Sequence, residues 1–266
     1  MIKKIFAGIF LLAVVFLVGN EIDKRLSAQT IQEIADGPKI LVLNYHQVNN
    51  NFSPLAVPVT AFADQMHYLV ESGYVSITPS ELADGLAGEI TLPEKPVLIT
   101  FDDGYIDNYT NAFPILKAQG LRATIFVIPS SIGSGNYMSW ENLKEMEKNG
   151  ITIQSHTMHH AKLEELPDDE IRKELLDSKN LLEEQLGHTV EFLAYPTGTY
   201  NLHIAGIAHD VGYKAAFTVK YGNVDLGSNM YALERVPIFQ TESTMKNFFE
   251  RVEYRQSFEE FGWIKK

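Results

Sequence analysis

The sequence predicts an α/β fold in which parallel strands form a barrel, complete or incomplete. Short, nearly continuous apolar runs alternate with helical patterns along most of the chain, as strands buried on both faces of a parallel sheet do. Glycines follow most of the helical segments, which is a common signal at a helix end. About seven strand–helix units fall in one stretch without a linker rich in Pro, Gly or Ser, which favours one barrel over two domains.

The predicted strands are apolar segments bounded by turn residues: Ile40–Tyr45, Val75–Ile77, Val97–Phe101, Ala123–Ile128, Ile151–Gln154, Glu191–Tyr195 and Ala215–Val219. The predicted helices between and after them are Thr60–Ser72, Ser80–Ala87, Tyr109–Gln119, Ser139–Asn149, Asp168–Leu186, Leu202–Val211 and Ser243–Tyr254. An open, doubly wound sheet made of the same units is the alternative architecture.

The first residues have the layout of a secretory signal. Lys3 and Lys4 precede the apolar run Ile5–Gly19, and a charged segment followed by an apolar one is typical of such signals. The run is shorter than the roughly 20 residues of a spanning helix, and Leu26-Ser27-Ala28 is a poor cleavage site. Either a signal peptide or an uncleaved membrane anchor is therefore expected, and both place the remaining chain outside the cytoplasm. The predicted organisation is a signal or anchor over 1–28, a linker over 29–38 and one domain over 39–266.

The composition excludes several classes of protein and site. The chain has 266 residues, with 22 Lys and Arg against 34 Asp and Glu, and a net charge of −12. No nucleic acid is expected as a partner, because nucleic-acid binding normally requires a basic surface. There is no Cys, so disulfides, thiolate nucleophiles and zinc sites with sulfur ligands are excluded. A metal site would have to use histidine and carboxylate ligands.

Polar clusters follow four of the predicted strands. They are Asn44-Tyr45-His46, Thr100-Phe101-Asp102-Asp103-Gly104, Ser155-His156-Thr157-Met158-His159-His160 and Tyr195-Pro196-Thr197-Gly198. In barrels of parallel strands the chemistry gathers on the loops at the carboxyl ends of the strands. The clusters therefore predict one shared site at the mouth of the barrel.

Asp102 and Asp103 are expected to approach one locus because the chain turns at Gly104. Two carboxylates in one pocket repel each other. A divalent cation bound by one of them relieves that repulsion and frees the other to act as a base. The alternative is that they cap the helix that follows.

His156 and His160 lie four residues apart and would face the same way on a helical turn, and His159 at a spacing of three is also compatible. Two imidazoles and one carboxylate form a ligand set with open positions for water and substrate. A metal ion in such a site makes bound water more acidic and polarises a carbonyl group. A histidine-rich loop can also be plain surface, but its combination with the aspartate pair favours a metal site.

His46 and Arg235 each allow two interpretations. A lone histidine at a strand end is often structural, but in a metal hydrolase it could protonate a leaving amine as the general acid. Arg235, in Leu233-Glu234-Arg235-Val236-Pro237, is either part of a surface ion pair or the partner that orients a catalytic aspartate.

These motifs resemble those of the polysaccharide deacetylases of the NodB-homology type, carbohydrate esterase family 4. Thr100–Gly104 matches the TFDDG motif of that family, and Ser155–His160 matches its H-[S/T]-x-x-H motif, with His159 as a spacer. The resemblance implies a distorted (β/α)7 barrel, so the predicted fold is a distorted or incomplete (β/α)7 barrel of parallel strands. It also implies the site residues: Asp102 as general base, and Asp103, His156 and His160 as ligands of a divalent ion, Zn²⁺ or else Co²⁺ or Ni²⁺.

The chain departs from the family pattern at the third motif, R-x-P-Y. The matching stretch carries Ala194 at the arginine position, and Arg235 is the candidate substitute for the missing partner of the base. Thr197 takes the position whose backbone N–H stabilises the oxyanion, a role that does not depend on the side chain. Tyr195 is expected either to line the sugar site or to pack in the barrel, and Asn44 and Tyr45 are candidates for lining the pocket.

The C-terminal leucine–histidine motif of the family is also absent, because no histidine follows His209. His46 lies near the start instead, as in the permuted IcaB/PgaB-like subgroup that deacetylates poly-β-1,6-N-acetylglucosamine in biofilms. The resemblance therefore implies a metal-dependent hydrolase that removes N-acetyl groups from an extracellular N-acetylglucosamine polymer and releases acetate. Peptidoglycan or chitin-type N-acetylglucosamine is the alternative substrate, and an inactive carbohydrate-binding surface protein is the alternative function.

Overall fold

The computed structural model describes residues 37, 39–242 and 244–254. The described residues of 39–224 and 228–254 form one compact unit. The other unit has only Gly37 and Asp225–Gly227 among the described residues. The predicted signal or anchor over 1–28, and all of the predicted linker except Gly37, lie outside them. Within the described ranges, no helix combines the length and the apolar character that crossing a membrane requires.

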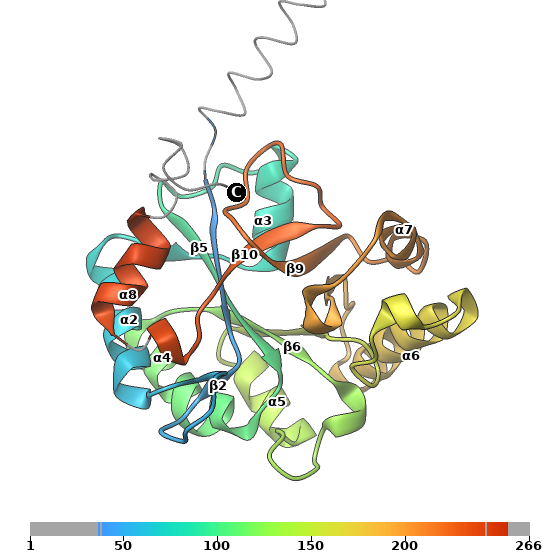
Figure 1. Cartoon of the computed structure of the whole chain (residues 1–266), viewed down its shortest axis with the longest axis horizontal. Coiled ribbons are helices and arrows are strands. Elements are labelled where there is room, and N and C mark those ends of the chain that lie inside the picture. The colour runs from blue at the N-terminus through green and yellow to red at the C-terminus, as the bar shows by residue number, and fades with distance from the viewer. Residues whose placement is uncertain (1–36, 38, 243, 255–266) are drawn as a thin grey trace, which may run out of the picture. The chain divides into compact units, whose positions relative to one another are not determined.

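Seven parallel strands close into a barrel (Figure 1). Around the ring they are β1 (Leu41–Tyr45), β10 (Leu233–Pro237), β9 (Ala215–Tyr221), β8 (Phe192–Ala194), β7 (Ile151–Ser155), β6 (Ala123–Val127) and β5 (Pro96–Asp103). Pairing of β1 with β5 closes the ring, which rules out the open-sheet alternative. The barrel is distorted at two places: β7 and β8 are paired at Ser155 and Leu193, and the register between β9 and β10 shifts at a bulge. The predicted fold class is confirmed.

One member of the barrel differs from the prediction. Strand β4 (Val75–Ser76), predicted as part of the ring, pairs with the first residues of β5 and lies outside it. Its place is taken by β10, which was not predicted as a strand and lies between β1 and β9. Glu234 and Arg235 interrupt the apolar pattern of β10, and Arg235 can be buried there because it has a charged partner inside the barrel. Two short strands, β2 (Gln47–Val48) and β3 (Ala56–Val57), pair outside the ring.

Most helices begin and end close to the predicted positions (Figure 1). They are α2 (Val59–Glu71), α3 (Pro79–Leu86), α4 (Phe113–Gln119), α5 (Trp140–Glu147), α6 (Asp168–Leu186), α7 (Leu202–Asp210) and α8 (Met245–Phe249). Shorter helical turns are η1 (Asn108–Ala112), η2 (Pro129–Ser131), η3 (Leu163–Glu165), η4 (Pro196–Gly198), η5 (Gln240–Glu242) and η6 (Glu250–Tyr254). Thr78 and Glu81 form a reciprocal capping box at the start of α3. Gly120 and Gly187 end α4 and α6 in the left-handed conformation.

Alternation along the strands divides the core into two clusters, because successive side chains point to opposite faces. One face packs against the helices, and the other fills the barrel with Val42, Leu98, Phe126, Phe192, Phe217 and Leu233. Ile77 and Leu82, from the region of β4 and α3, join this inner cluster. Two residues farther along the same face, polar side chains replace apolar ones: Asn44 follows Val42, Thr100 follows Leu98, and Arg235 follows Leu233. The barrel therefore has an apolar lower layer and a buried polar layer toward its carboxyl end.

Candidate active site

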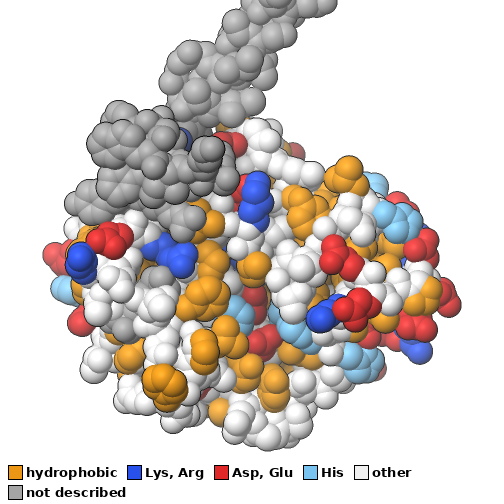
Figure 2. All heavy atoms as spheres, in the orientation of Figure 1, with side chains coloured by type: hydrophobic (Ala, Val, Ile, Leu, Met, Phe, Trp, Pro, Cys, Tyr) orange, Lys and Arg blue, Asp and Glu red, His pale blue; other side chains and the backbone are white. Residues whose placement is uncertain are grey.

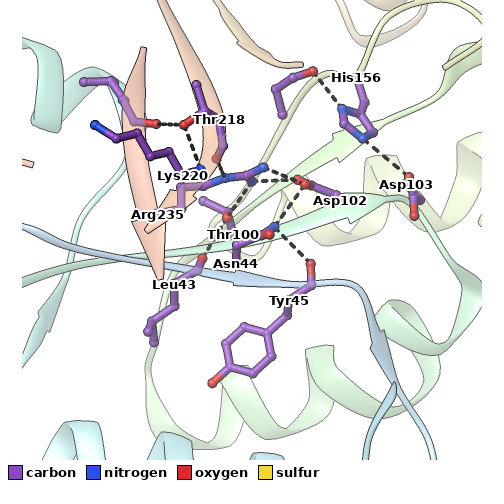
Figure 3. Close-up of polar contacts among 12 residues, drawn as sticks. Leu43, Asn44, Tyr45, Thr100, Asp102, Asp103, His156, Thr218, Lys220 and Arg235 are labelled. Carbon is purple, nitrogen blue, oxygen red and sulfur yellow. Dashed lines mark hydrogen bonds and ion pairs between the residues drawn. The ribbon is translucent and has the colours of Figure 1, made fainter. Parts of the chain in front are cut away.

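The carboxylate of Asp102 lies in the polar layer and is held by two side chains (Figure 3). Arg235 contacts both oxygens, with Nη1–Oδ1 and Nη2–Oδ2 distances of 2.8 and 2.7 Å. Asn44 Nδ2 donates to Oδ2 at 3.0 Å. The side chains of Arg235 and Asp102 are 0% and 2% exposed, so water does little to screen the pair. A carboxylate offers about four acceptor positions, and one on Oδ1 is left for a substrate or a water molecule.

Strands on both sides hold Arg235 in place. Its Nε donates to the carbonyl of Thr218 on β9 at 2.7 Å, and its Nη1 also reaches Thr100 Oγ1 at 3.2 Å. The guanidinium lies over the ring of Phe126, 5.9 Å from the centroid. The guanidinium of Arg235 on β10 is thus paired with Asp102 inside the barrel, and its burial contradicts the alternative of a surface ion pair.

Asp102 is kept ionised by its neighbours. Burial alone would raise its pKa, but the charge and hydrogen bonds of Arg235, together with the charge of His156, hold the pKa well below the usual range of a carboxyl group. The oxygens of Asp102 face Arg235 and Asn44. The alternative that Asp102 caps the following helix is thus not supported.

Asp103, His156 and His160 form the second half of the site. One ligand atom from each lies within 4.8 Å of the others, and the two Nε2 atoms are 3.5 and 3.6 Å from Asp103 Oδ1. His156 Nδ1 is 2.7 Å from the carbonyl oxygen of Ala194. A carbonyl can only accept, so Nδ1 carries a proton, and in the neutral ring this leaves Nε2 able to bind a metal, as in histidines that bind metals. The set of two nitrogens and one oxygen fits a divalent ion such as zinc.

His159 does not share this site. Its side chain is 60% exposed, and its Nδ1 lies 2.6 Å from Glu174 Oε1. Of the two candidate histidine pairs, only the one spaced by four residues therefore lies in the candidate ligand set. Figure 2 shows histidine and acidic side chains gathered in a hollow on the face that it presents.

A left-handed backbone turns the two neighbouring aspartates toward one site. Strand alternation would send Asp103 to the face opposite Asp102, but Asp103 has a φ of 75°. Among the described residues, the other non-glycine residues with positive φ are Thr157 (63°), His160 (57°) and Thr197 (57°). Such positions cost roughly 1–3 kcal/mol each and tend to cluster at functional sites. Gly104 follows with a φ of 84°, and a Cβ there would lie 3.0 Å from Val127 Cγ1, so this turn requires glycine.

His46 and Thr197 lie at the same mouth of the barrel. Burial lowers the pKa of His46; the charges of Asp102 and Asp103 oppose that shift without reversing it. The charges of Asp102 and of Asp103 therefore both act on His46. Thr197 is exposed in η4, directly after β8. Gly198 behind it has a φ of 73°, and a Cβ there would lie 2.3 Å from Val219 Cγ2, so this turn also requires glycine.

Three residues expected to line the sugar pocket are fully buried: Asn44, Tyr45 and Tyr195. Tyr45 belongs to the cluster on the helix side of the barrel, and its hydroxyl donates to Gln65 Oε1 at 2.8 Å. Tyr195 stacks on Tyr200, with centroids 5.3 Å apart, and its hydroxyl donates to a backbone carbonyl at 3.1 Å. The two tyrosines are packing residues, and Asn44 acts on Asp102. Burial corrects the expectation that these side chains contact a sugar.

The sequence places Thr100 in one of the four polar clusters, but no role was predicted for its side chain. Its hydroxyl donates to the carbonyl of Leu43 at 2.7 Å and lies 3.2 Å from Arg235 Nη1, so it links β1, β5 and β10. A signal was present, because Thr100 precedes Asp102 by two residues and therefore lies on the same face of the strand.

Comparison with known proteins agrees with this geometry. The residue pattern of the family described as polysaccharide deacetylase matches residues 89–216. YxkH of Bacillus subtilis, provisionally assigned as a polysaccharide deacetylase, is 39% identical over 200 residues, which cover 75% of this chain and 71% of YxkH. The chain belongs to the polysaccharide deacetylase family. The deacetylase pattern spans both motifs but not His46 or Arg235, which lie on either side of it.

Two further relatives of this deacetylase are informative. The poly-β-1,6-N-acetyl-D-glucosamine N-deacetylase of Staphylococcus aureus is 29% identical over 228 residues, covering 74% of this chain and 78% of that enzyme. The solved structure of Streptococcus pyogenes deacetylase PplD in complex with acetate is 32% identical with a TM-score of 0.76. That similarity covers 82% of this chain and 99% of PplD.

Proposed function

We propose that this deacetylase removes N-acetyl groups from poly-β-1,6-N-acetylglucosamine outside the cytoplasm and releases acetate. The observation that carries the proposal is an ionised, buried Asp102 next to a ligand set of one carboxylate and two imidazoles. The similarity to the Staphylococcus aureus enzyme supports the choice of substrate. The location of His46 after the first strand supports it as well.

Asp103, His156 and His160 would hold a divalent ion, for which we propose Zn²⁺, with Co²⁺ or Ni²⁺ as substitutes. When bound, such an ion supplies Lewis-acid chemistry, polarising a carbonyl group and making a water molecule more acidic. The bond from His156 Nδ1 to Ala194 supports this role, because it fixes the tautomer that leaves Nε2 able to bind metal.

The protein side chains move the protons. Asp102 takes a proton from water through the acceptor position on Oδ1 that Arg235 leaves available, and the hydroxide attacks the acetyl carbon. The Thr197 N–H donates to the oxyanion that develops. His46 protonates the departing glucosamine nitrogen as the C–N bond breaks, and acetate leaves. A lowered pKa makes protonated His46 a stronger acid, which suits this step.

The N-terminal segment supports a location outside the cytoplasm, either secreted or anchored at the cell surface. Lys3 and Lys4 before an apolar run are typical of a signal or anchor. The acidic chain, with a net charge of −12, would not repel a neutral glycan and would attract a partly deacetylated, cationic one. Turnover of a partly deacetylated polymer should then depend on salt concentration.

Acetate release from defined β-1,6 and β-1,4 oligomers of N-acetylglucosamine, with mapping of the products, tests the proposal. A preference for β-1,6 oligomers is expected. A preference for β-1,4 oligomers would indicate a peptidoglycan or chitin-type deacetylase, and binding without turnover would indicate a carbohydrate-binding protein.

A further inference from the structure

No side chain of the described residues orients the His46 imidazole through its Nδ1 atom. Its Nδ1 is buried, and within the described part of the chain it has no hydrogen-bond partner. Histidines that transfer protons are generally oriented by a group bonded to the second ring nitrogen. The ring of Phe239 lies 6.2 Å away, centroid to centroid, and offers no polar group. The direction of the imidazole must therefore depend on how the backbone after β1 is held.

Asn108 holds that backbone directly. Its Nδ2 donates to the carbonyl oxygen of His46 at 2.8 Å, across 62 residues of sequence. The Asn108 side chain is fully buried. The bond to the His46 carbonyl is half-buried. An intramolecular hydrogen bond contributes about 0.5–1.5 kcal/mol, so the bond restrains the chain at His46 to the place where Asn108 can reach it.

Neighbours of Asn108 hold the residues that follow His46. Asp107 Oδ1 accepts from the Val48 N–H at 3.2 Å and from Asn108 Nδ2 at 3.0 Å. Asn111 Nδ2 donates to the Val48 carbonyl at 2.7 Å. One helical turn therefore holds His46 through Asn108 and Val48 through Asp107 and Asn111.

The local sequence explains the shape of this turn. In η1 the Phe113 N–H donates to the carbonyl of Asn108, five residues earlier, so the turn is wider than an α-helix. Pro114 has no N–H to donate to the carbonyl four residues before it, which disfavours a regular turn at this point. Such wide turns often occur at functional sites.

We propose that Asn108 is a positioning residue for proton donation: by binding the His46 carbonyl, it directs the imidazole toward the leaving nitrogen. The inference rests on the proposed role of His46 as the acid. Asn108 touches neither the ligand set nor Asp102 in the described contacts, so its effect is confined to the step that needs a proton from His46.

Two substrates with different leaving groups test the proposal. An N-acetylglucosamine oligomer loses an amine that must be protonated, whereas 4-nitrophenyl acetate loses a phenolate that needs no proton. General acid catalysis contributes about 10²–10⁴-fold, so Asn108→Ala should lower kcat on the oligomer by roughly 10–100-fold and leave kcat on the ester nearly unchanged. His46→Ala should show the same split, and the double variant should be no slower than His46→Ala alone.

Asn149→Ala is the matched control. Asn149 Nδ2 also donates to a backbone carbonyl at 2.8 Å, that of Glu145 at the exposed end of α5, and its loss should change neither rate. If Asn108→Ala does not fold, Asn111→Ala should give the same split with a smaller amplitude.

Equal losses on the oligomer and the ester, or losses that add to those of His46→Ala, would overturn the positioning role while the function stands. If the wild-type protein released no acetate from any oligomer, both the positioning role of Asn108 and the proposed function would be overturned.

Discussion

The two halves of the active site differ in how complete they are in the folded chain. Asp102, Arg235 and Asn44 form a closed and fully buried network in which the opposite charges meet at 2.7–2.8 Å. The ligand atoms of His156 and His160 lie 3.5 and 3.6 Å from Asp103, and His160 is 33% exposed. In the first half, protein groups already hold the carboxylate and balance its charge, with one acceptor position left on Asp102 Oδ1, whereas the geometry of the second half leaves room for an ion between its ligands.

The difference follows from where the residues are located. The first half comes from β1, β5 and β10, whose paired backbones form the barrel wall. The second half comes from Asp103, the last residue of β5, and from His156 and His160 in the loop after β7. Asp103 and His160 have positive φ. Folding alone therefore prepares the base, whereas the ligand set carries backbone strain that ion binding would offset.

The largest expected effect is that of Asp102→Asn. An amide cannot take the proton from water, so kcat for acetate release should fall by about 10²–10⁴-fold. The variant should still bind one zinc ion, because Asp102 belongs to the other half. Metal content after dialysis is the check, and loss of the ion together with the activity would show that the halves are not separate.

The next largest effect is expected on zinc affinity, and two adjacent histidines allow it to be tested. His160→Ala removes a ligand and should weaken zinc binding by more than the roughly 10–100-fold that loss of a hydrogen bond to a ligand costs. His159→Ala is the control, since His159 is exposed and bonded to Glu174. Competition with a chelator measures both affinities, and equal losses in the two variants would contradict the assigned ligand set.

A smaller effect on turnover, but a large one on stability, is expected for Arg235→Met. Removing one partner of a buried ion pair leaves an uncompensated charge and costs about 3–5 kcal/mol of unfolding free energy, measurable by urea denaturation. In the wild type the pKa of Asp102 is lower in the folded state than in the unfolded state. Ionised Asp102 therefore stabilises the fold at pH values above its pKa in the unfolded chain. This stabilisation is lost as the pH falls through its pKa in the folded protein. Without Arg235, burial raises the pKa, so activity should decline at a higher pH than in the wild type. If activity declined at the same acidic pH in Arg235→Met as in the wild type, the result would contradict the role of Arg235 in keeping Asp102 ionised.

The smallest expected effect is that of pH on zinc affinity, through protonation of His156. In the ion-free protein burial would lower the pKa of His156, but Asp102 and Asp103 outweigh it and raise the pKa above its ordinary value. Protonated His156 cannot bind metal, so zinc affinity should fall by about tenfold per pH unit once the pH drops below that raised pKa. Zinc affinity that stays constant down to about pH 5 would contradict the assignment of His156 as a ligand.

The sequence predicts the second half of the site better than the first. Asp103, His156 and His160 belong to short motifs, so their spacing is visible in the chain. Arg235 lies 133 residues from Asp102, and no local pattern connects them. The strand that carries Arg235 was missed for the same reason, since a charged residue inside a barrel is tolerated only with a partner that the sequence does not reveal. Asn108 was missed because an asparagine near a helix start resembles an ordinary cap.

A zinc titration of acetate release tests most directly the claim that folding prepares only the base. The protein would be stripped with a chelator, checked for an unchanged urea midpoint, and assayed on N-acetylglucosamine oligomers as zinc is added back. The stripped protein is expected to be folded but inactive, and its activity should return in full at one zinc ion per chain. Full activity in the stripped protein, or no recovery with zinc, cobalt or nickel, would contradict the claim.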